Sequence, residues 1–593
     1  MELTRVFDLL TNLEQICPDK EDMLARRINN QWVKYSTKEY VRLSHAAARS
    51  FLALGLKPGT RVISITSNRP EWNFIDMGCA LSRMVHTPVY PTLSAEDYLF
   101  IFNHSEAEII FIGTELLYKK IAPVAEQMDK PAKVILIDES DSIYCFKQFL
   151  AEGEKDKEAL EALEAVIADN IRNTDKDEFF SLIYTSGTTG QPKGVMLSHY
   201  NLVFDSHGHA VRQYMGKENK IVSFLPLCHT YERSMNYHYQ ECGISIYYTD
   251  IANFAADLKD SKADGFCAVP RVLEMLYSKL EAARTSLKGV QALVYRRAWK
   301  FANNFDNYND SPLYQWRRRM FDKLVYHKWR EKLGGQKEMQ VISGGSSIQP
   351  RILRCFTAAN IQCYEGYGMT ETSPVIAVGD PRHRIQVIGT VGTPIEGTEL
   401  KFASDGEVLT KGPHVMLGYY KAPELTAEII DKDGFLHTGD IGYLQDDKYL
   451  KITDRKKEIF KLSNGKYVAP QAIETRIKET SNFISNCMVV GENEKFASAI
   501  IIPSFSKLVS YAKYKKINFT DNDDLLQKPE IQKLLQNQIV KVNETLAPHE
   551  QIKREQFVND EWTVDNKMLS QTLKLKRANI YAKYKDTIKE IYQ

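Results

Sequence analysis

Short apolar runs alternate with helix-like segments over most of the chain. The run RVISITS (61–67) ends in small polar residues, and a helical stretch that carries Trp72 and Phe74 follows it. Strands that alternate with helices predict βαβ units, so we expect the α/β class with largely parallel sheets. The same pattern recurs at 107–113, 133–138, 179–185 and 220–226.

The chain is too long for one hydrophobic core, because single cores stop growing near about 250–300 residues, and it has 593 residues. Residues 387–413 are rich in Gly, Thr and β-branched side chains, which predicts a small β subdomain. A charged segment, 454–462, precedes a final stretch of mixed α/β character. We therefore predict a large N-terminal domain, 1–454, and a smaller α/β C-terminal domain, 455–593.

Charge and cysteine usage narrow the class of protein. The net charge is +1, so no global field attracts nucleic acid, and we expect no nucleic-acid partner. Nine cysteines without a CxxC pair argue against a disulfide framework or a structural zinc site and fit a reducing cytosol. The sequence shows neither a signal-peptide segment nor a run of roughly 18 apolar residues. We expect a cytoplasmic protein, at most peripheral at the inner face of a membrane.

Residues 184–194 read YTSGTTGQPKG and follow a predicted strand. Gly187 and Gly190 let the backbone bend tightly and turn its N–H groups towards an anion. Lys193 adds a positive charge and four hydroxyls add neutral donors, so the segment suits a polyphosphate. A flexible surface loop is the plain alternative, and a Walker A motif is disfavoured because Gly194 follows the lysine. The four hydroxyls belong to Thr185, Ser186, Thr188 and Thr189.

This segment resembles the phosphate-binding signature of the adenylate-forming superfamily, and further motifs of that superfamily follow in the expected order. YEGYGMTETSPV (364–375) has the form typical of long-chain fatty acyl-CoA synthetases. The resemblance implies an enzyme with a mobile C-terminal domain that uses ATP, Mg²⁺ and coenzyme A to activate a fatty acid. The other motifs are SGGSSI (343–348), near adenine, HTGDIG (437–442), near ribose, DRKKEIFKLSNGKYVAP (454–470), at the hinge, and QTLKLKR (571–577), around a catalytic lysine.

The resemblance implies roles at the phosphates. Glu371 and Thr185 would hold Mg²⁺, which prefers hard oxygen ligands, and Thr370 would hydrogen-bond the α-phosphate. Lys193 would neutralise phosphate charge. Because a carboxylate must attack a phosphate, charge neutralisation and alignment are most of the task. An exposed loop acid is the plain alternative for Glu371.

The resemblance also implies a nucleoside site. Tyr367 would stack on adenine, with Gly344 and Gly345 letting the backbone approach the base. Asp440 offers two acceptor oxygens for the two ribose hydroxyls, although an Asp after Thr-Gly can equally cap a turn. Arg455 would reach the ribose or a phosphate from the hinge side.

Lys574 is the expected catalytic cation of adenylation, able to approach both the carboxylate and the departing phosphate oxygens. A solvated basic run, with Lys576 and Arg577, is the alternative. The family performs thioester formation after rotating its C-terminal domain, which makes Lys457 the hinge residue. Lys461 and Lys466 are candidates for binding coenzyme A, or belong to a charged surface strand.

The acyl site is expected near LPLCHTYERSMNYHY (225–239), with His229 close to the carboxylate, although a lone His is usually structural. Gly366 leaves room for an alkyl chain. Residues 288–337 resemble an insertion of long-chain members and carry twelve Lys or Arg against four Asp or Glu, a net charge of +8. This segment either packs on the domain as a solvated helix or rests on anionic lipid.

Two motifs depart from the family pattern. Ser346 and Ser347 replace the usual Ala-Pro after the two glycines, and 569–572 read LSQT in place of LTPT. Two alternatives stay open at this point. The acyl group could pass to a carrier protein instead of coenzyme A, or the chain could be a non-catalytic lipid-binding homologue.

Overall fold

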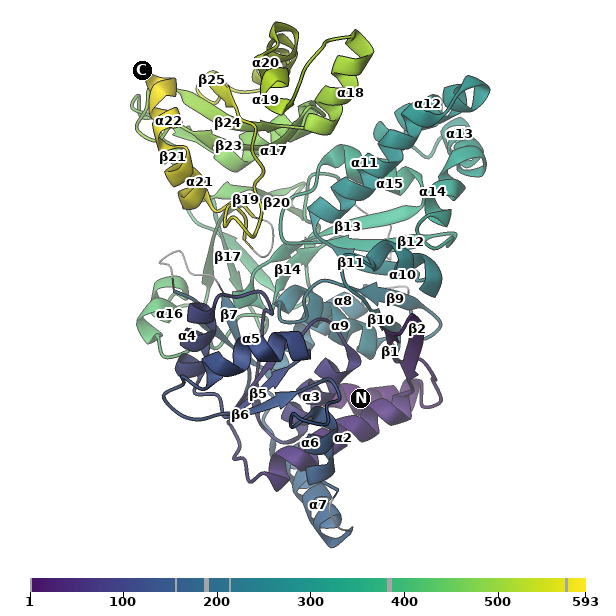
Figure 1. Cartoon of the computed structure of the whole chain (residues 1–593), viewed down its shortest axis with the longest axis vertical. Coiled ribbons are helices and arrows are strands. Elements are labelled where there is room, and N and C mark those ends of the chain that lie inside the picture. Colours follow the sequence, from purple (N-terminus) through teal and green to yellow (C-terminus); the bar gives the residue numbers. More distant parts are fainter. Residues whose placement is uncertain (1–2, 155–156, 186–190, 213–214, 381–386, 571–573) are drawn as a thin grey trace.

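A computed structural model describes residues 3–154, 157–185, 191–212, 215–380, 387–570 and 574–593 (Figure 1). It confirms the expected α/β class, with a large N-terminal domain and a smaller C-terminal domain that lies at the top of Figure 1.

The largest sheet has nine strands. Its centre is parallel, and its two ends are antiparallel because β1 and β2 form a hairpin and the chain reverses from β13 to β14. In spatial order the strands are β15 (Thr393–Pro394), β14 (Val375–Val378), β13 (Ile361–Gly368), β12 (Met339–Ser343), β11 (Gly265–Ala268), β9 (Lys220–Ser223), β10 (Ser245–Tyr248), β1 (Leu24–Ile28) and β2 (Gln31–Tyr35).

A second sheet of seven strands contains the other apolar runs found in the sequence. Strands β7, β4, β3, β5 and β6 are parallel, whereas β8 and β18 pair antiparallel beside β7. The order is β18 (Gly418–Tyr419), β8 (Lys193–Ser198), β7 (Phe179–Thr185), β4 (Val85–Val89), β3 (Arg61–Ile65), β5 (Ile109–Ile112) and β6 (Lys133–Leu136).

Helices join and cover these two sheets, and one apolar cluster includes Val62 of β3 and Val222 of β9, so both sheets share a core. Helix α2 begins at a capping box in which Ser36 and Glu39 satisfy each other's backbone N–H groups. The helices of this part are α1 (Asp8–Ile16), α2 (Thr37–Ala53), α3 (Pro70–Leu81), α4 (Ala95–Ser105), α5 (Glu115–Ala125), α6 (Phe146–Glu152), α7 (Lys157–Asn173), α8 (His199–Ala210), α9 (Thr230–Glu241), α10 (Phe254–Ser261), α11 (Pro270–Ser286) and α15 (Pro350–Ala358).

The expected β subdomain is an antiparallel four-stranded sheet. It consists of β16 (Glu399–Phe402), β17 (Glu407–Lys411), β19 (Leu436–Gln445) and β20 (Tyr449–Arg455), with α16 (Pro423–Ile429) beside it. The β19–β20 pairing sets Asp440 opposite Arg455. This register matters because both residues belong to the predicted nucleoside site.

The C-terminal domain has apolar clusters of its own, which contain only residues from 460 onward, whereas the remaining clusters end at 452. The boundary at 454/455 stays a prediction. The elements are β21 (Phe460–Lys461), β22 (Tyr467–Val468), α17 (Pro470–Thr480), β23 (Ile484–Val490), β24 (Ala497–Pro503), α18 (Phe505–Lys515), α19 (Asn522–Gln527), α20 (Pro529–Asn543), β25 (Ile552–Phe557), α21 (Arg577–Lys583) and α22 (Lys585–Tyr592).

Polar contacts join the two domains beside the main sheet. Arg351 of α15 donates to the Lys478 carbonyl at 3.2 Å and to the side chain of Asn482. Glu281 of α11 pairs with Lys507 of α18. These contacts accompany one orientation of the C-terminal domain, the one that Figure 1 shows.

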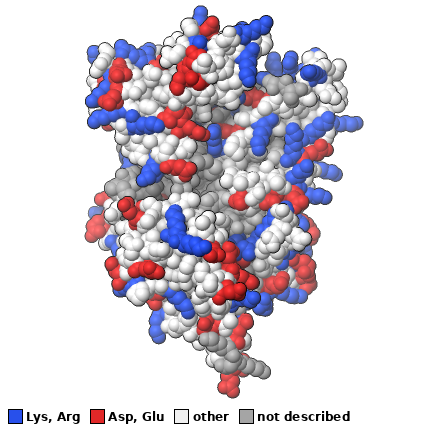
Figure 2. Space-filling model, viewed as in Figure 1, with Lys and Arg blue, Asp and Glu red and all other residues white. Residues whose placement is uncertain are grey.

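The basic insertion folds as α12 (Gly289–Asn303), α13 (Pro312–Phe321), a π-helical turn (Asp322–Tyr326) and α14 (His327–Glu331). It packs on the domain through buried aromatic side chains that include Trp299 and Trp329. Lys and Arg gather on this side of the molecule, at the upper right of Figure 2. None of the helices in the described ranges is both long enough and apolar enough to cross a membrane. Exposed apolar side chains remain at Val290, Leu293, Leu313, Trp316 and Leu324.

Candidate active site

The predicted phosphate segment lies at the end of the β7–β8 hairpin. Thr185, the last residue of β7, pairs with Lys193, the first residue of β8. The pairing of the two strands thus sets Thr185 and Lys193 directly opposite each other. Ser186, Gly187, Thr188, Thr189 and Gly190 lie outside the described residues.

Lys193 is linked to the predicted metal-binding acid through a tyrosine. The Lys193 ammonium lies over the Tyr419 ring, 5.1 Å from its centroid. The Tyr419 hydroxyl donates a 2.7 Å hydrogen bond to Glu371 Oε1. Glu371 and Thr370 are both buried in a single 3-10 turn that follows β13. The structure therefore brings the lysine, Glu371 and Thr370 into one region, as the motifs predicted.

The predicted nucleoside residues form a connected trio. Tyr367 donates to Asp440 Oδ2 at 2.8 Å, and Arg455 Nε donates to Asp440 Oδ1 at 3.1 Å. The Arg455 side chain is 44% exposed, so it can exchange a partner with a ligand. Burial raises the pKa of Tyr367, and the neighbouring Asp440 raises it further. Tyr367 therefore stays a neutral hydrogen-bond donor.

Gly344 and Gly345 follow β12 at the edge of the same region. A Cβ at Gly344 would lie 3.1 Å from the ring of Tyr231, so this backbone packs directly on an aromatic face. Gly345 has a φ of +86°, in the left-handed region that favours glycine. Close packing thus favours glycine at the first position and backbone conformation favours it at the second, whereas the approach of this backbone to an adenine base stays a prediction.

Lys574 comes from the C-terminal domain into this cleft. Its backbone pairs with the segment before it: Ser570 N donates to the Lys574 carbonyl at 2.8 Å, and Leu569 forms an antiparallel bridge with Leu575. Its ammonium is solvent-exposed, yet protein surrounds the cleft, and this partial desolvation lowers its pKa to about 8. Arg455 lowers the pKa further, whereas Asp440, Glu458 and Glu371 favour the charge. The predicted catalytic lysine therefore interacts electrostatically with residues of the predicted nucleoside site and with Glu371.

Comparisons with known proteins agree with this geometry. Residues 14–420 match the AMP-binding enzyme family, and residues 457–593 match the AMP-binding enzyme C-terminal domain. The chain belongs to the AMP-binding enzyme family. The resemblance read from the motifs is thus confirmed.

Two relatives of this family member align over nearly the whole chain. The long-chain-fatty-acid–CoA ligase FadD15 of Mycobacterium bovis is 31% identical over 96% of this chain and 94% of its own. Human long-chain-fatty-acid–CoA ligase 1 is 30% identical over 95% of this chain and 82% of its own.

Solved structures share the fold. The adenylation domain of a carboxylate reductase from Mycobacterium chelonae aligns with a TM-score of 0.73 at 20% identity, over 99% of this chain and 91% of that one. A fatty acyl CoA synthetase of Mycobacterium tuberculosis aligns with a TM-score of 0.60 at 18% identity, over 98% of this chain and 99% of that one.

In this AMP-binding enzyme, His229 caps helix α9. Its Nδ1 accepts the Tyr231 N–H at 3.1 Å, at the first turn of α9. Burial lowers the pKa of His229 to about 4, and Lys574 lowers it further. The ring is therefore neutral near pH 7. Because Nδ1 accepts a hydrogen bond, its proton resides on Nε2, which leaves Nε2–H as a donor.

The glycines of the Tyr-Gly motif have separate physical reasons. A Cβ at Gly366 would make an ordinary 3.7 Å contact with Val378, so the position leaves space. A Cβ at Gly368 would lie 1.7 Å from the Pro374 carbonyl, so only glycine fits there.

The residues predicted to serve the second half-reaction lie on the hinge and just beyond it. Lys457, Lys461 and Lys466 are all exposed, the last two on or beside the β21–β22 ribbon. Lys461 lies over the ring of Tyr467, 5.7 Å from its centroid. Their roles stay predictions.

Sequence reasoning missed two residues that the structure places at the site. Tyr419 lies 48 positions from Glu371 and outside every motif used for prediction, so no local pattern pointed to its contact. Arg577 was taken as part of a basic run, yet its guanidinium pairs with Glu458 and Glu474. In the sequence Arg577 follows Lys576 directly, and nothing in this basic run pointed to two carboxylate partners.

Proposed function

We propose that this enzyme activates a long-chain fatty acid with ATP as an acyl-adenylate, releases pyrophosphate, and transfers the acyl group to coenzyme A. The observation that carries the proposal is the hydrogen-bonded trio of Tyr367, Asp440 and Arg455. Lys574 of the C-terminal domain interacts electrostatically with this trio and with Glu371. The names of the full-length relatives support the substrate class.

The site fits a bound nucleotide. Asp440 Oδ1 accepts from the half-exposed Arg455 and Oδ2 accepts from Tyr367, and exchanging these partners for two ribose hydroxyls keeps the hydrogen bonds of Asp440 satisfied. Tyr367 provides an aromatic ring near the end of β13, the strand that pairs with β12 ahead of the two glycines. Mg²⁺ is commonly held by one or two carboxylates together with substrate phosphates. In this proposal Glu371, with Thr185, supplies the protein side, and the ion neutralises phosphate charge.

The first half-reaction joins two anions. A carboxylate oxygen of the fatty acid forms a bond to the α-phosphorus as the bond to pyrophosphate breaks. Lys193 and Lys574 supply cations on two sides, and Thr370 donates to the α-phosphate. Preorganised donors of this kind lower a barrier by about 3–4 kcal/mol. Neutral His229, with its proton on Nε2, donates to the carboxylate without competing as a second charge.

The second half-reaction requires a thiol to attack the acyl carbonyl, which releases AMP. We propose that rotation of the C-terminal domain about Lys457 removes Lys574 from the cleft and brings Lys461 and Lys466 towards the coenzyme A phosphates. The contacts of Arg351 and Glu281 with the C-terminal domain belong to the first orientation. A carrier protein as acceptor is the alternative that the experiment must separate.

The test is a series of saturated acids of increasing length, each incubated with ATP, Mg²⁺ and coenzyme A, with AMP and thioester measured separately. We expect the highest kcat/KM at about ten carbons or more, because each buried CH₂ adds about 0.8 kcal/mol and Gly366 does not close the site. Peak activity on acetate or aromatic acids contradicts the substrate class. AMP release without thioester would instead support the carrier-protein alternative.

We also propose that the insertion at 288–337 contacts a membrane surface from the cytoplasmic side. Trp316 is 59% exposed and Leu324 48% exposed, and both are surrounded in sequence by Lys and Arg. At low salt the enzyme should co-sediment with vesicles of anionic lipid. Trp316→Glu should reduce the co-sedimenting fraction at least threefold. Equal sedimentation of both proteins would contradict the contact.

A further inference from the structure

Arg577 lies between two carboxylates that come from separate segments. Its Nη1 and Nη2 donate to both oxygens of Glu474 at 2.8 and 2.7 Å, and its Nε donates to Glu458 at 2.6 Å. This is the two-pronged geometry that makes an arginine–carboxylate pair strong and directional. The Arg577 side chain is only 21% exposed, so solvent screens the pairs incompletely.

Both carboxylates are themselves held in place. Glu474 of α17 is 5% exposed and also accepts the Val489 N–H at 2.7 Å, which ties it to strand β23 at the edge of the domain's three-stranded sheet. Glu458 accepts from the Gln471 side chain at 2.8 Å. The Glu458 N–H donates to the Arg455 carbonyl at 2.9 Å. One neighbour of Arg577 is therefore the domain core, and the other is the hinge segment that carries Arg455.

Arg577 follows Lys574 by three residues, and the backbone between them is tied to residues 568–570. Lys574 N donates to Ser570 Oγ at 3.0 Å, and Lys576 N donates to the Met568 carbonyl at 2.9 Å. A shift of Arg577 would therefore displace Lys574. Arg455, on the segment to which Glu458 belongs, pairs with Asp440 at the same time.

We propose that Arg577 is a positioning residue for adenylation: its clamp between Glu458 and Glu474 sets the place of Lys574 relative to Arg455 and Asp440. This inference rests on the proposed function of Lys574. All three clamp residues lie beyond Lys457, so the clamp moves with the C-terminal domain. Its effect is therefore confined to the half-reaction in which Lys574 occupies the cleft.

The experiment measures the two half-reactions of the full chain separately: pyrophosphate release from ATP and fatty acid, and thioester formation from supplied acyl-adenylate and coenzyme A. Arg577→Gln should slow the first by roughly 10- to 100-fold, since a misplacement near 1 Å can cost this much, and leave the second within threefold. The adenylation rate of Arg577→Lys should lie between those of the unchanged enzyme and Arg577→Gln. An ammonium keeps the positive charge but cannot make the two parallel hydrogen bonds of a guanidinium.

Lys583→Gln is the matched control. Lys583 ends the same helix, α21, and pairs with Asp560, not with Glu458 or Glu474. Both half-reactions should stay within twofold of the unchanged enzyme. Equal slowing of both half-reactions by Arg577→Gln would show a general structural role and overturn the proposal, and so would full adenylation activity.

Glu458→Gln is a second variant for the case in which Arg577→Gln fails to fold. It removes one ion pair of Arg577 but keeps the pair with Glu474. Glu458 raises the pKa of Lys574, so removing its negative charge should lower that pKa. Adenylation should slow severalfold, and its loss of rate at alkaline pH should begin at a lower pH. An unmoved limb with an unchanged rate would overturn the proposal. Failure of the proposed function looks different: Lys574→Ala would then leave adenylation intact, whatever Arg577→Gln does.

Discussion

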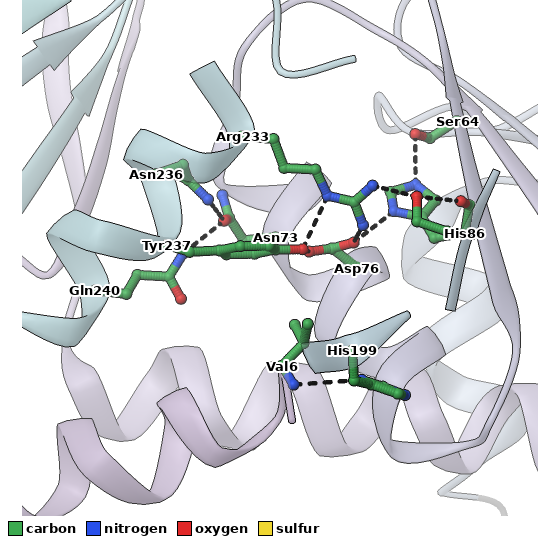
Figure 3. Close-up of polar contacts among 11 residues, drawn as sticks. Val6, Ser64, Asn73, Asp76, His86, His199, Arg233, Asn236, Tyr237 and Gln240 are labelled. Atoms are coloured by element: carbon green, nitrogen blue, oxygen red, sulfur yellow. Dashed lines mark hydrogen bonds and ion pairs between the residues drawn. The ribbon is translucent and has the colours of Figure 1, made fainter. Parts of the chain in front are cut away.

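Two trios of the same residue types, Asp, Arg and Tyr, lie in the N-terminal domain and at its border. In the first, Asp76 of α3 accepts from Arg233 at 2.5 Å and also from Tyr237, and all three are buried (Figure 3). In the second, Asp440 accepts from Arg455 and Tyr367, and its arginine is half-exposed. The residue types are shared, but only the second trio can exchange a partner for a ligand.

The buried trio has no position left for a substrate. The carboxylate of Asp76 also accepts from His86 at 2.6 Å, and Arg233 Nε donates to the Tyr237 hydroxyl at 2.9 Å. Burial raises the pKa of Asp76, but Arg233 and these hydrogen bonds outweigh it and hold that pKa below its usual range. The trio therefore fixes α9 against α3, whereas the open trio is available for chemistry.

The largest expected effect is a difference in the free energy of unfolding between variants of the two trios. Asp76→Asn should lower the free energy of unfolding by about 3–5 kcal/mol, because it leaves a buried guanidinium without its counter-charge. Asp440→Asn should lower it by no more than about 1 kcal/mol, since Arg455 faces solvent. Chemical denaturation of both variants measures this. Equal losses would remove the distinction between the trios.

The next effect reverses the order and concerns ATP. Asp440→Ala should reduce kcat/KM for ATP by roughly 10- to 100-fold, because hydrogen bonds to a charged group contribute about 1.5–3 kcal/mol. Asp76→Asn, assayed at a temperature where it is folded, should keep its KM for ATP within threefold. A nucleotide defect in the Asp76 variant as large as in the Asp440 variant would contradict the assignment.

A smaller effect sharpens the description of the open trio, which Lys574 faces. The Lys574 ammonium loses its charge as pH rises through its pKa of about 8. In the free enzyme, kcat/KM for pyrophosphate release should therefore fall by about fivefold between pH 8 and 9. Lys574→Arg, which stays charged, should lack this fall whatever its absolute rate. A similar alkaline limb in both proteins would assign the titration to another group.

Local patterns predicted much of this molecule. The apolar runs at 61–67 and 107–113 became β3 and β5, because a short apolar run with turn residues around it has few other solutions. The motifs also identified Tyr367, Asp440 and Arg455, which the structure brings together.

Side-chain contacts between segments far apart in the chain could not be predicted from local sequence patterns. Tyr367 and Asp440 are 73 positions apart, and only the packing of β13 against the β19–β20 hairpin brings them within 2.8 Å. The same limit hid the contact of Tyr419 with Glu371 and the clamp around Arg577. A buried Asp–Arg pair such as Asp76–Arg233 also carries no local signal that distinguishes it from a functional pair.

The central claim is that the fatty acid carboxylate attacks the α-phosphorus of ATP. Its most direct test supplies a fatty acid labelled with oxygen-18 in its carboxylate, together with ATP, Mg²⁺ and coenzyme A, and analyses the nucleotide product by mass spectrometry. We expect AMP that carries a single oxygen-18 atom taken from the carboxylate. Unlabelled AMP, or ADP as the product, would contradict it.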